Sequence, residues 1–187
     1  AAAGVAVARL GTAAVDLAAL ERALRGEGSG DGKVCDLAEA AERVAAWRSR
    51  GERVVLTNGC FDLLHPGHLH LLREASRAGR RLVVALNADE SVRRLKGPSR
   101  PVQDLAARAR LLAALDMTDL VVPFDEDTPA RVVEALRPDV LVKGADYRLE
   151  EVVGGAFVQA AGGDVLLVPL LDGHSTTGLV RAAAGPR

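Results

Sequence analysis

Aromatic side chains are scarce in this sequence. Of its 187 residues, 3% are Phe, Trp or Tyr, whereas 49% are hydrophobic, so the core is predicted to be aliphatic and alanine-rich. No apolar run approaches the roughly 20 residues that a transmembrane helix needs, so no membrane partner is expected. The N-terminus lacks a basic stretch followed by an apolar one, which argues against a signal peptide.

Cysteine is rare as well, and neither sign of charge dominates. Two cysteines, Cys35 and Cys60, do not make a disulfide framework and favour a reduced, cytoplasmic setting. The 24 basic and 25 acidic residues nearly cancel, which gives no support to nucleic-acid binding through a basic surface. A chain of this length has room for one good core and a small additional unit.

A glycine-rich stretch divides the chain. Residues 26–33 read as a flexible linker between residues 1–25 and a domain over 34–187, whose core is expected at 52–184. The linker is not a nucleotide-binding P-loop, which would need glycine in place of Glu27 and Ser or Thr in place of Val34.

From residue 53 onward, short apolar runs alternate with helical patterns. Runs such as Leu82–Leu86 are continuously apolar, as in a parallel sheet covered on both faces. The alternation predicts a doubly wound α/β domain with its ligand beyond the carboxyl ends of the strands. The predicted strands are 53–57, 81–86, 119–123, 139–142 and 164–168. The predicted helices are 67–78, 89–95, 104–115, 128–136, 150–161 and 176–184, preceded by an additional N-terminal helix over 37–50 that Asp36 caps.

The stretch from Thr57 to His68 joins the first predicted strand to a helix through a glycine-bearing turn. A helix N-terminus offers unpaired N–H groups and a positive dipole end, which suit a phosphate. His65 and His68 add donors whose charge is adjustable near neutral pH. With His70 they also suggest zinc, but no cysteine or carboxylate lies at ligand spacing, so no metal site is predicted and His70 is expected to face away.

Further polar residues follow the other predicted strands, and several of them have a structural alternative. Asp89 suits an N-cap, Lys96 a C-terminal helix charge, and Asp146 a turn cap. The hydroxyl residues before the last helix form an N-cap cluster that also suits phosphate oxygens. The candidates in this group are Asn87, Asp89, Lys96, Lys143, Gly144, Asp146, Ser175, Thr176 and Thr177.

The pattern Gly59-x-Phe61-Asp62-x-x-His65-x-Gly67-His68 resembles the signature of the cytidylyltransferase-like nucleotidyltransferases. Within that superfamily the sequence is similar to the heptose 1-phosphate adenylyltransferases, from about residue 52 to about residue 184. It shares Leu95-Lys96-Gly97, Leu141-Val142-Lys143-Gly144 and His174-Ser175-Thr176-Thr177 with them. Residues 1–25 resemble the C-terminal tail of a ribokinase-type sugar kinase, as fused in the bifunctional heptose enzymes, which implies a parent kinase domain.

The resemblance implies a Rossmann-like fold of the HxGH type and a reaction of ATP with D-glycero-beta-D-manno-heptose 1-phosphate, giving ADP-heptose and pyrophosphate. Magnesium would arrive with the ATP. His65 and His68 would serve the triphosphate and the transition state, and Lys96, Arg108 and Lys143 would neutralise phosphates. The remaining nucleotide or phosphate contacts implied are Asn58, Gly59, Phe61, Asp62, Gly67, Asn87, Asp89, Gly144, Asp146, Ser175, Thr176 and Thr177.

Two alternatives remain at this point. One is a cytidylyltransferase acting on glycerol 3-phosphate, which is disfavoured because related cytidylyltransferases carry an arginine that is missing before Ser175. The other is a nucleotide-binding module without turnover, which has less need of both histidines. The sequence leaves open whether the chain forms a homo-oligomer.

Overall fold

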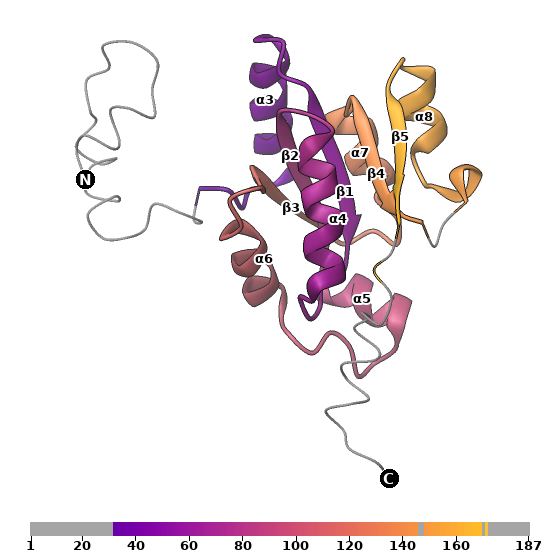
Figure 1. Cartoon of the computed structure of the whole chain (residues 1–187). Coiled ribbons are helices and arrows are strands. Elements are labelled where there is room, and N and C mark those ends of the chain that lie inside the picture. The colour runs from indigo at the N-terminus through magenta and orange to yellow at the C-terminus, as the bar shows by residue number, and fades with distance from the viewer. Residues whose placement is uncertain (1–31, 146–147, 170, 172–187) are drawn as a thin grey trace, which may run out of the picture.

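A five-stranded, fully parallel sheet forms the centre of the computed structural model, which describes residues 32–145, 148–169 and 171 (Figure 1). The predictions for residues 1–25, Asp146, Ser175, Thr176, Thr177 and the helix over 176–184 lie outside these residues. The strands are β1 (Val54–Gly59), β2 (Arg81–Asn87), β3 (Leu120–Phe124), β4 (Val140–Gly144) and β5 (Asp164–Val168).

In the strand order β3-β2-β1-β4-β5, successive strands are added first on one side of β1 and then on its other side. From β1 the chain proceeds to β2 and β3 on one side, then crosses back so that β4 pairs with the other side of β1. Leu56 accordingly lies opposite Val83 on β2 and Leu141 on β4. The topological switch point therefore lies between the carboxyl ends of β1 and β4, where open α/β sheets bind their ligands.

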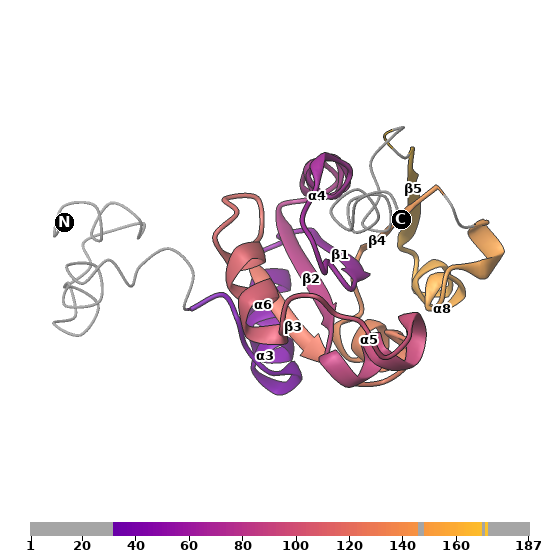
Figure 2. The ribbon, with the colours of Figure 1, turned by 90° about the horizontal axis from the view of Figure 1, so that it is seen from below.

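Helices cover both faces of this sheet, as predicted (Figure 2). One face packs against α3 (Leu37–Arg48), α7 (Ala130–Leu136) and α8 (Gly155–Ala160). The other packs against α4 (Pro66–Arg77) and α6 (Leu105–Ala113). The remaining elements are α5 (Asp89–Lys96), beyond one end of the strands in Figure 1, and a 3-10 turn at Leu149–Glu151.

The core consists of two aliphatic layers, one on each face of the sheet. Alternate strand residues enter opposite layers: Leu56 and Val83 lie in the first, and Val55 and Val84 in the second. Trp47 of α3 packs into the first layer, and the Arg81 guanidinium lies 5.1 Å from its ring centroid. Within the described part of the chain, no helix is long and apolar enough to cross a bilayer.

Several helix ends differ from the sequence predictions by one or two residues, and one predicted helix is divided. Asp36 caps α3 by accepting from the Glu39 amide, as expected, but the helix ends at Arg48 rather than at residue 50. The helix predicted over 150–161 divides at Gly154, whose φ of +85° is incompatible with a right-handed helix. A Cβ at this position would lie 2.8 Å from Val133 Cγ1, so close packing against α7 requires the glycine as well.

The end of the predicted linker extends the sheet. The Cys35 amide donates to the Val121 carbonyl at 3.1 Å, and the Val121 amide donates to the Lys33 carbonyl at 2.8 Å. These bonds lay a short parallel segment along the outer edge of β3. Part of the exposed edge of β3 is therefore paired by the segment that leads into α3.

We predict that G79A destabilises the fold. Gly79 lies between α4 and β2, and a Cβ there would lie 2.6 Å from Val55 Cγ2 and 2.9 Å from the Arg53 carbonyl oxygen. Urea denaturation should show a loss of about 1–3 kcal/mol. G155A is the matched control, since its Cβ would have no neighbour closer than 3.5 Å. Equal stability of the two variants would contradict the packing argument.

Candidate nucleotide site

The motif turn connects β1 to the start of α4. His65 is the N-cap of α4, and its Nδ1 accepts a hydrogen bond from the His68 amide at 3.3 Å. Pro66 occupies the first helical position, where a missing N–H costs nothing. The sequence thereby places a helix N-terminus and two imidazoles at the carboxyl end of the strand that borders the switch point.

The two histidine rings stack on each other, with centroids 3.7 Å apart and planes inclined by 19°. Burial lowers the pKa of His68 to about 4, the charge on His65 and Lys96 acts in the same direction, and a backbone hydrogen bond with Leu63 opposes both. The Nδ1 atom of His68 is buried and has no hydrogen-bond partner. His68 is therefore a neutral imidazole with one uncommitted nitrogen at neutral pH.

Phe61 shapes the turn behind this pair. Its φ of +44° is unusual for a residue with a side chain and costs of order 1–3 kcal/mol. The conformation buries the ring 5.0 Å from that of His68. A Cβ on Gly59 would lie 3.1 Å from Phe61 Cε2, so glycine leaves room for the aromatic ring. Gly59 and Phe61 therefore shape the motif turn by packing against each other and against His68.

Lys143 spans the switch point. It lies on β4 immediately before Gly144, and its Nζ donates to the Asn58 carbonyl oxygen on β1 at 3.5 Å. Five of the six buried side-chain polar atoms that lack a partner among the described residues belong to β1, α4 and the loop after α5. They are Thr57 Oγ1, Asn58 Oδ1, His68 Nδ1, Arg100 Nη2 and Gln103 Oε1, with Thr118 Oγ1 as the sixth. Such a concentration of unpaired groups is expected where a polar ligand binds.

Lys96 ends α5 near the histidine loop. Its charge contributes to lowering the pKa of His68 and also acts on Cys60. Burial nevertheless raises the pKa of the Cys60 thiol, which agrees with a packing role for this cysteine rather than a nucleophilic one. Asn87 anchors the start of the helix, since its Nδ2 donates to Ser91 Oγ at 2.9 Å.

Asp62 has a different environment from the one expected of a nucleotide contact. Its side chain is 2% exposed, and it accepts from Arg100 Nε at 2.5 Å and from the amides of Val102 and Gln103 at 2.7 and 3.1 Å. The carboxylate therefore ties the loop after α5 to the motif turn. The pairing joins residues 38 apart in the sequence and depends on tertiary structure.

Arg108 and Asp89 also differ from expectation. The Arg108 side chain is 0% exposed, and its Nη2 pairs with Asp89 Oδ1 at 2.7 Å. Ala88, rather than Asp89, is the N-cap of α5, and Asp89 is the first helical residue. The Arg108 side chain is buried, and its guanidinium group donates hydrogen bonds to acceptors from several segments inside the protein.

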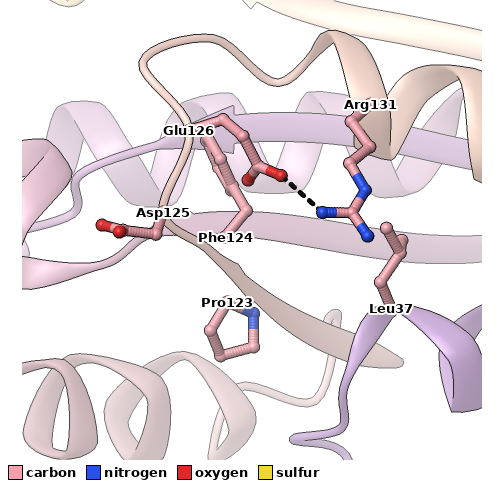
Figure 3. A pocket seen from close by; sticks show the side chains of 6 residues that line it. All are labelled: Leu37, Pro123, Phe124, Asp125, Glu126 and Arg131. Atoms are coloured by element: carbon pink, nitrogen blue, oxygen red, sulfur yellow. Dashed lines mark hydrogen bonds and ion pairs between the residues drawn. The ribbon is translucent and has the colours of Figure 1, made fainter.

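A hollow of about 450 Å³ lies beside β3, away from the switch point (Figure 3). Glu126 and Arg131 form an ion pair across part of it at 2.9 Å. The residues that line it are Leu37, Pro123, Phe124, Asp125, Glu126 and Arg131. None of them is among the predicted site residues, so the hollow is separate from the histidine site.

The described residues include no group of three His, Cys, Asp or Glu side chains that could hold a metal ion. The carboxylates of Asp62 and Asp89 near the motif are both paired with arginines. This donor set does not fit a magnesium ion bound by protein ligands alone.

A parallel sheet with a helix N-terminus and two stacked imidazoles at its switch point defines a nucleotidyltransferase domain. The family model described as cytidylyltransferase-like matches residues 56–165, and the chain belongs to that family.

Relatives of high similarity carry the name bifunctional protein HldE. The chain is 55% identical to that of Gluconobacter oxydans over 181 residues and 56% identical to that of Bradyrhizobium sp. over 186 residues. These matches cover 97% and 98% of this chain but only 38% of each relative. Among solved structures, a lipopolysaccharide core biosynthesis protein from Thermoplasma volcanium is similar, with 29% identity and a TM-score of 0.54 over 65% of this chain and 98% of that one.

We predict that the His68 ring stays neutral well below pH 6. Folding lowers its pKa from 6.5 to about 4, so between these values the unfolded chain binds a proton that the folded chain does not. The contribution of His68 to the free energy of unfolding is therefore complete above pH 6.5 and is lost as the pH falls toward 4. NMR titration of ring-labelled histidine tests the pKa, and H68Q should remove this part of the pH dependence. A His68 titration near pH 6.5 would contradict the burial argument.

Proposed function

We propose that this domain transfers the adenylyl group of ATP to heptose 1-phosphate, giving ADP-heptose and pyrophosphate. The observation that carries the proposal is the stacked pair of His65 and His68 on the N-terminus of α4 at the switch point. The choice of ATP and of a heptose rests on the sequence resemblance to heptose 1-phosphate adenylyltransferases and on the HldE relatives.

In the proposed reaction an oxygen of the sugar phosphate attacks the α-phosphorus of ATP in line. The bond from that phosphorus to the bridging oxygen of the β-phosphate breaks, and pyrophosphate leaves with the electron pair. The attacking oxygen is already ionised, so no proton has to be removed. A neutral His68 with a low pKa suits this chemistry, because the reaction needs no general base.

Positioning and neutralisation of charge then supply the catalysis. His65, His68 and the first amides of α4 would hold phosphate oxygens, while Lys96 and Lys143 approach from α5 and β4. Magnesium bound to ATP would be held chiefly by phosphate oxygens and would neutralise part of their charge.

The domain is also proposed to belong to a longer protein with two activities. Residues 1–25 resemble the tail of a sugar kinase, and the relatives named as bifunctional are matched over 38% of their length. The kinase substrate would be the matching heptose phosphate, so that one protein makes and then uses the sugar 1-phosphate. Neither the cytidylyltransferase nor the binding-only alternative is favoured by these relatives.

Pyrophosphate release tests the proposed function directly. With magnesium present, ATP, CTP and GTP are crossed against heptose 1-phosphate and glycerol 3-phosphate. We expect turnover only with ATP and heptose 1-phosphate, and H68A should lower it by about 10²-fold or more with little loss of fold. Turnover with CTP and glycerol 3-phosphate would contradict the proposed substrates. If no pyrophosphate is released with any pair although ATP binds, the result would favour a nucleotide-binding module without turnover.

Lys96 should contribute to the rate through its charge. We expect K96A to lower kcat/KM by about 10²-fold, as for removal of one group that stabilises transition-state charge. Arg110 provides the matched control, since it is an exposed cation on α6, and R110A should stay within about twofold of the parent chain. Equal losses of kcat/KM in K96A and R110A would contradict a specific role for Lys96, because any positive charge on the surface would then have the same effect.

A further inference from the structure

The guanidinium of Arg108 joins four segments that surround the histidine loop. Its Nη1 donates to the Cys60 carbonyl at 2.6 Å and to the Asn87 carbonyl at 2.8 Å. Its Nε donates to the Gln103 carbonyl at 3.0 Å, and its Nη2 donates to Asp89 at 2.7 Å. The motif turn, the end of β2, the start of α5 and the loop after α5 therefore share one side chain from α6.

A buried charge of this kind is held by its acceptors. An isolated guanidinium in the interior would cost several kcal/mol, and a carboxylate with three carbonyl oxygens offsets that cost. Only the planar fork of arginine reaches all four acceptors at once, because lysine is a single point charge. The arrangement thus fixes the distances among the four segments rather than presenting a cation to solvent.

The α5 helix connects Asp89, which Arg108 holds, to Lys96. Asp89 begins the helix and Lys96 ends it, so the two are separated by about 10 Å along the axis. The second half of α5 is exposed from Arg93 to Lys96, and its burial is confined to Ser91 and Val92 near the start. Arg94 ties this exposed half to Asp127 at 2.6 Å through an ion pair in which both side chains are largely exposed. The buried tie to Arg108 lies at the start of the helix.

We propose that Arg108 and Asp89 form a clamp that sets the spacing between the histidine loop and Lys96, so that both act on the reaction by positioning without contacting a phosphate. This inference rests on the proposed adenylyl transfer for its rate measurements. It replaces the direct phosphate contact that the sequence suggested for Arg108.

The test is a double-mutant cycle of D89N and R108K in the full chain, with R110K on the same helix as the control. We expect each single variant to lower kcat by about 10-fold to 10²-fold, the loss that follows a displacement of about 1 Å. The KM for ATP should change much less. The double variant should be no slower than the slower single variant, because both changes open the same clamp.

A direct phosphate contact gives the opposite pattern. D89N would then release Arg108 toward the ligand and leave kcat near that of the parent chain. R108K would raise the KM for ATP. The effects of the two substitutions would add in the double variant. That result would overturn the clamp. If R108K does not fold, D89N alone decides between the two outcomes, because the Asp89 side chain is partly exposed and asparagine keeps its shape.

The ring signals of His65 and His68 give a readout that needs no turnover. In D89N they should shift relative to the parent chain, whereas in R110K they should not. If the parent chain releases no pyrophosphate, the proposed function fails, and the ring signals still decide the clamp. Unchanged ring signals in D89N would overturn the clamp even in an active enzyme.

Discussion

A single buried charge connects the parts of the candidate site. The Arg108 guanidinium is excluded from solvent. The free-energy cost of burying its charge is offset by the acceptors that Cys60, Asn87, Gln103 and Asp89 supply. The sheet brings the ends of β1 and β2 together, but it does not fix the loops beyond them. Asp62 adds a second tie from the motif turn to the loop after α5. The two ties make a rigid frame from segments that would otherwise be surface loops.

The packing of the motif turn explains why His68 is neutral. Phe61 and the motif turn bury His68 against His65, and the low pKa of His68 follows from that burial. In the proposed reaction both reacting groups are phosphates, so the site needs hydrogen bonds and positive charge rather than a base. A neutral His68 beside a helix N-terminus, with lysines from β4 and α5, meets that need.

Local patterns predicted the parts of the molecule that depend on local chemistry. Continuous apolar runs such as Leu82–Leu86 indicated the parallel sheet, Asp36 indicated a helix start, and the spacing of His65 and His68 indicated the motif turn. The acceptors of Arg108 were not predictable, because they come from residues up to 48 positions away and only the folded sheet brings them together. A buried arginine and a phosphate-binding arginine look the same in sequence.

A crystal structure with a non-hydrolysable ATP analogue tests the central claim most directly. The account predicts phosphate oxygens within hydrogen-bond distance of His65, His68 and the first amides of α4, with Arg108 still bonded to Asp89 beneath them. A nucleotide bound in the hollow beside β3, or an Arg108 side chain turned out onto the phosphates, would contradict it.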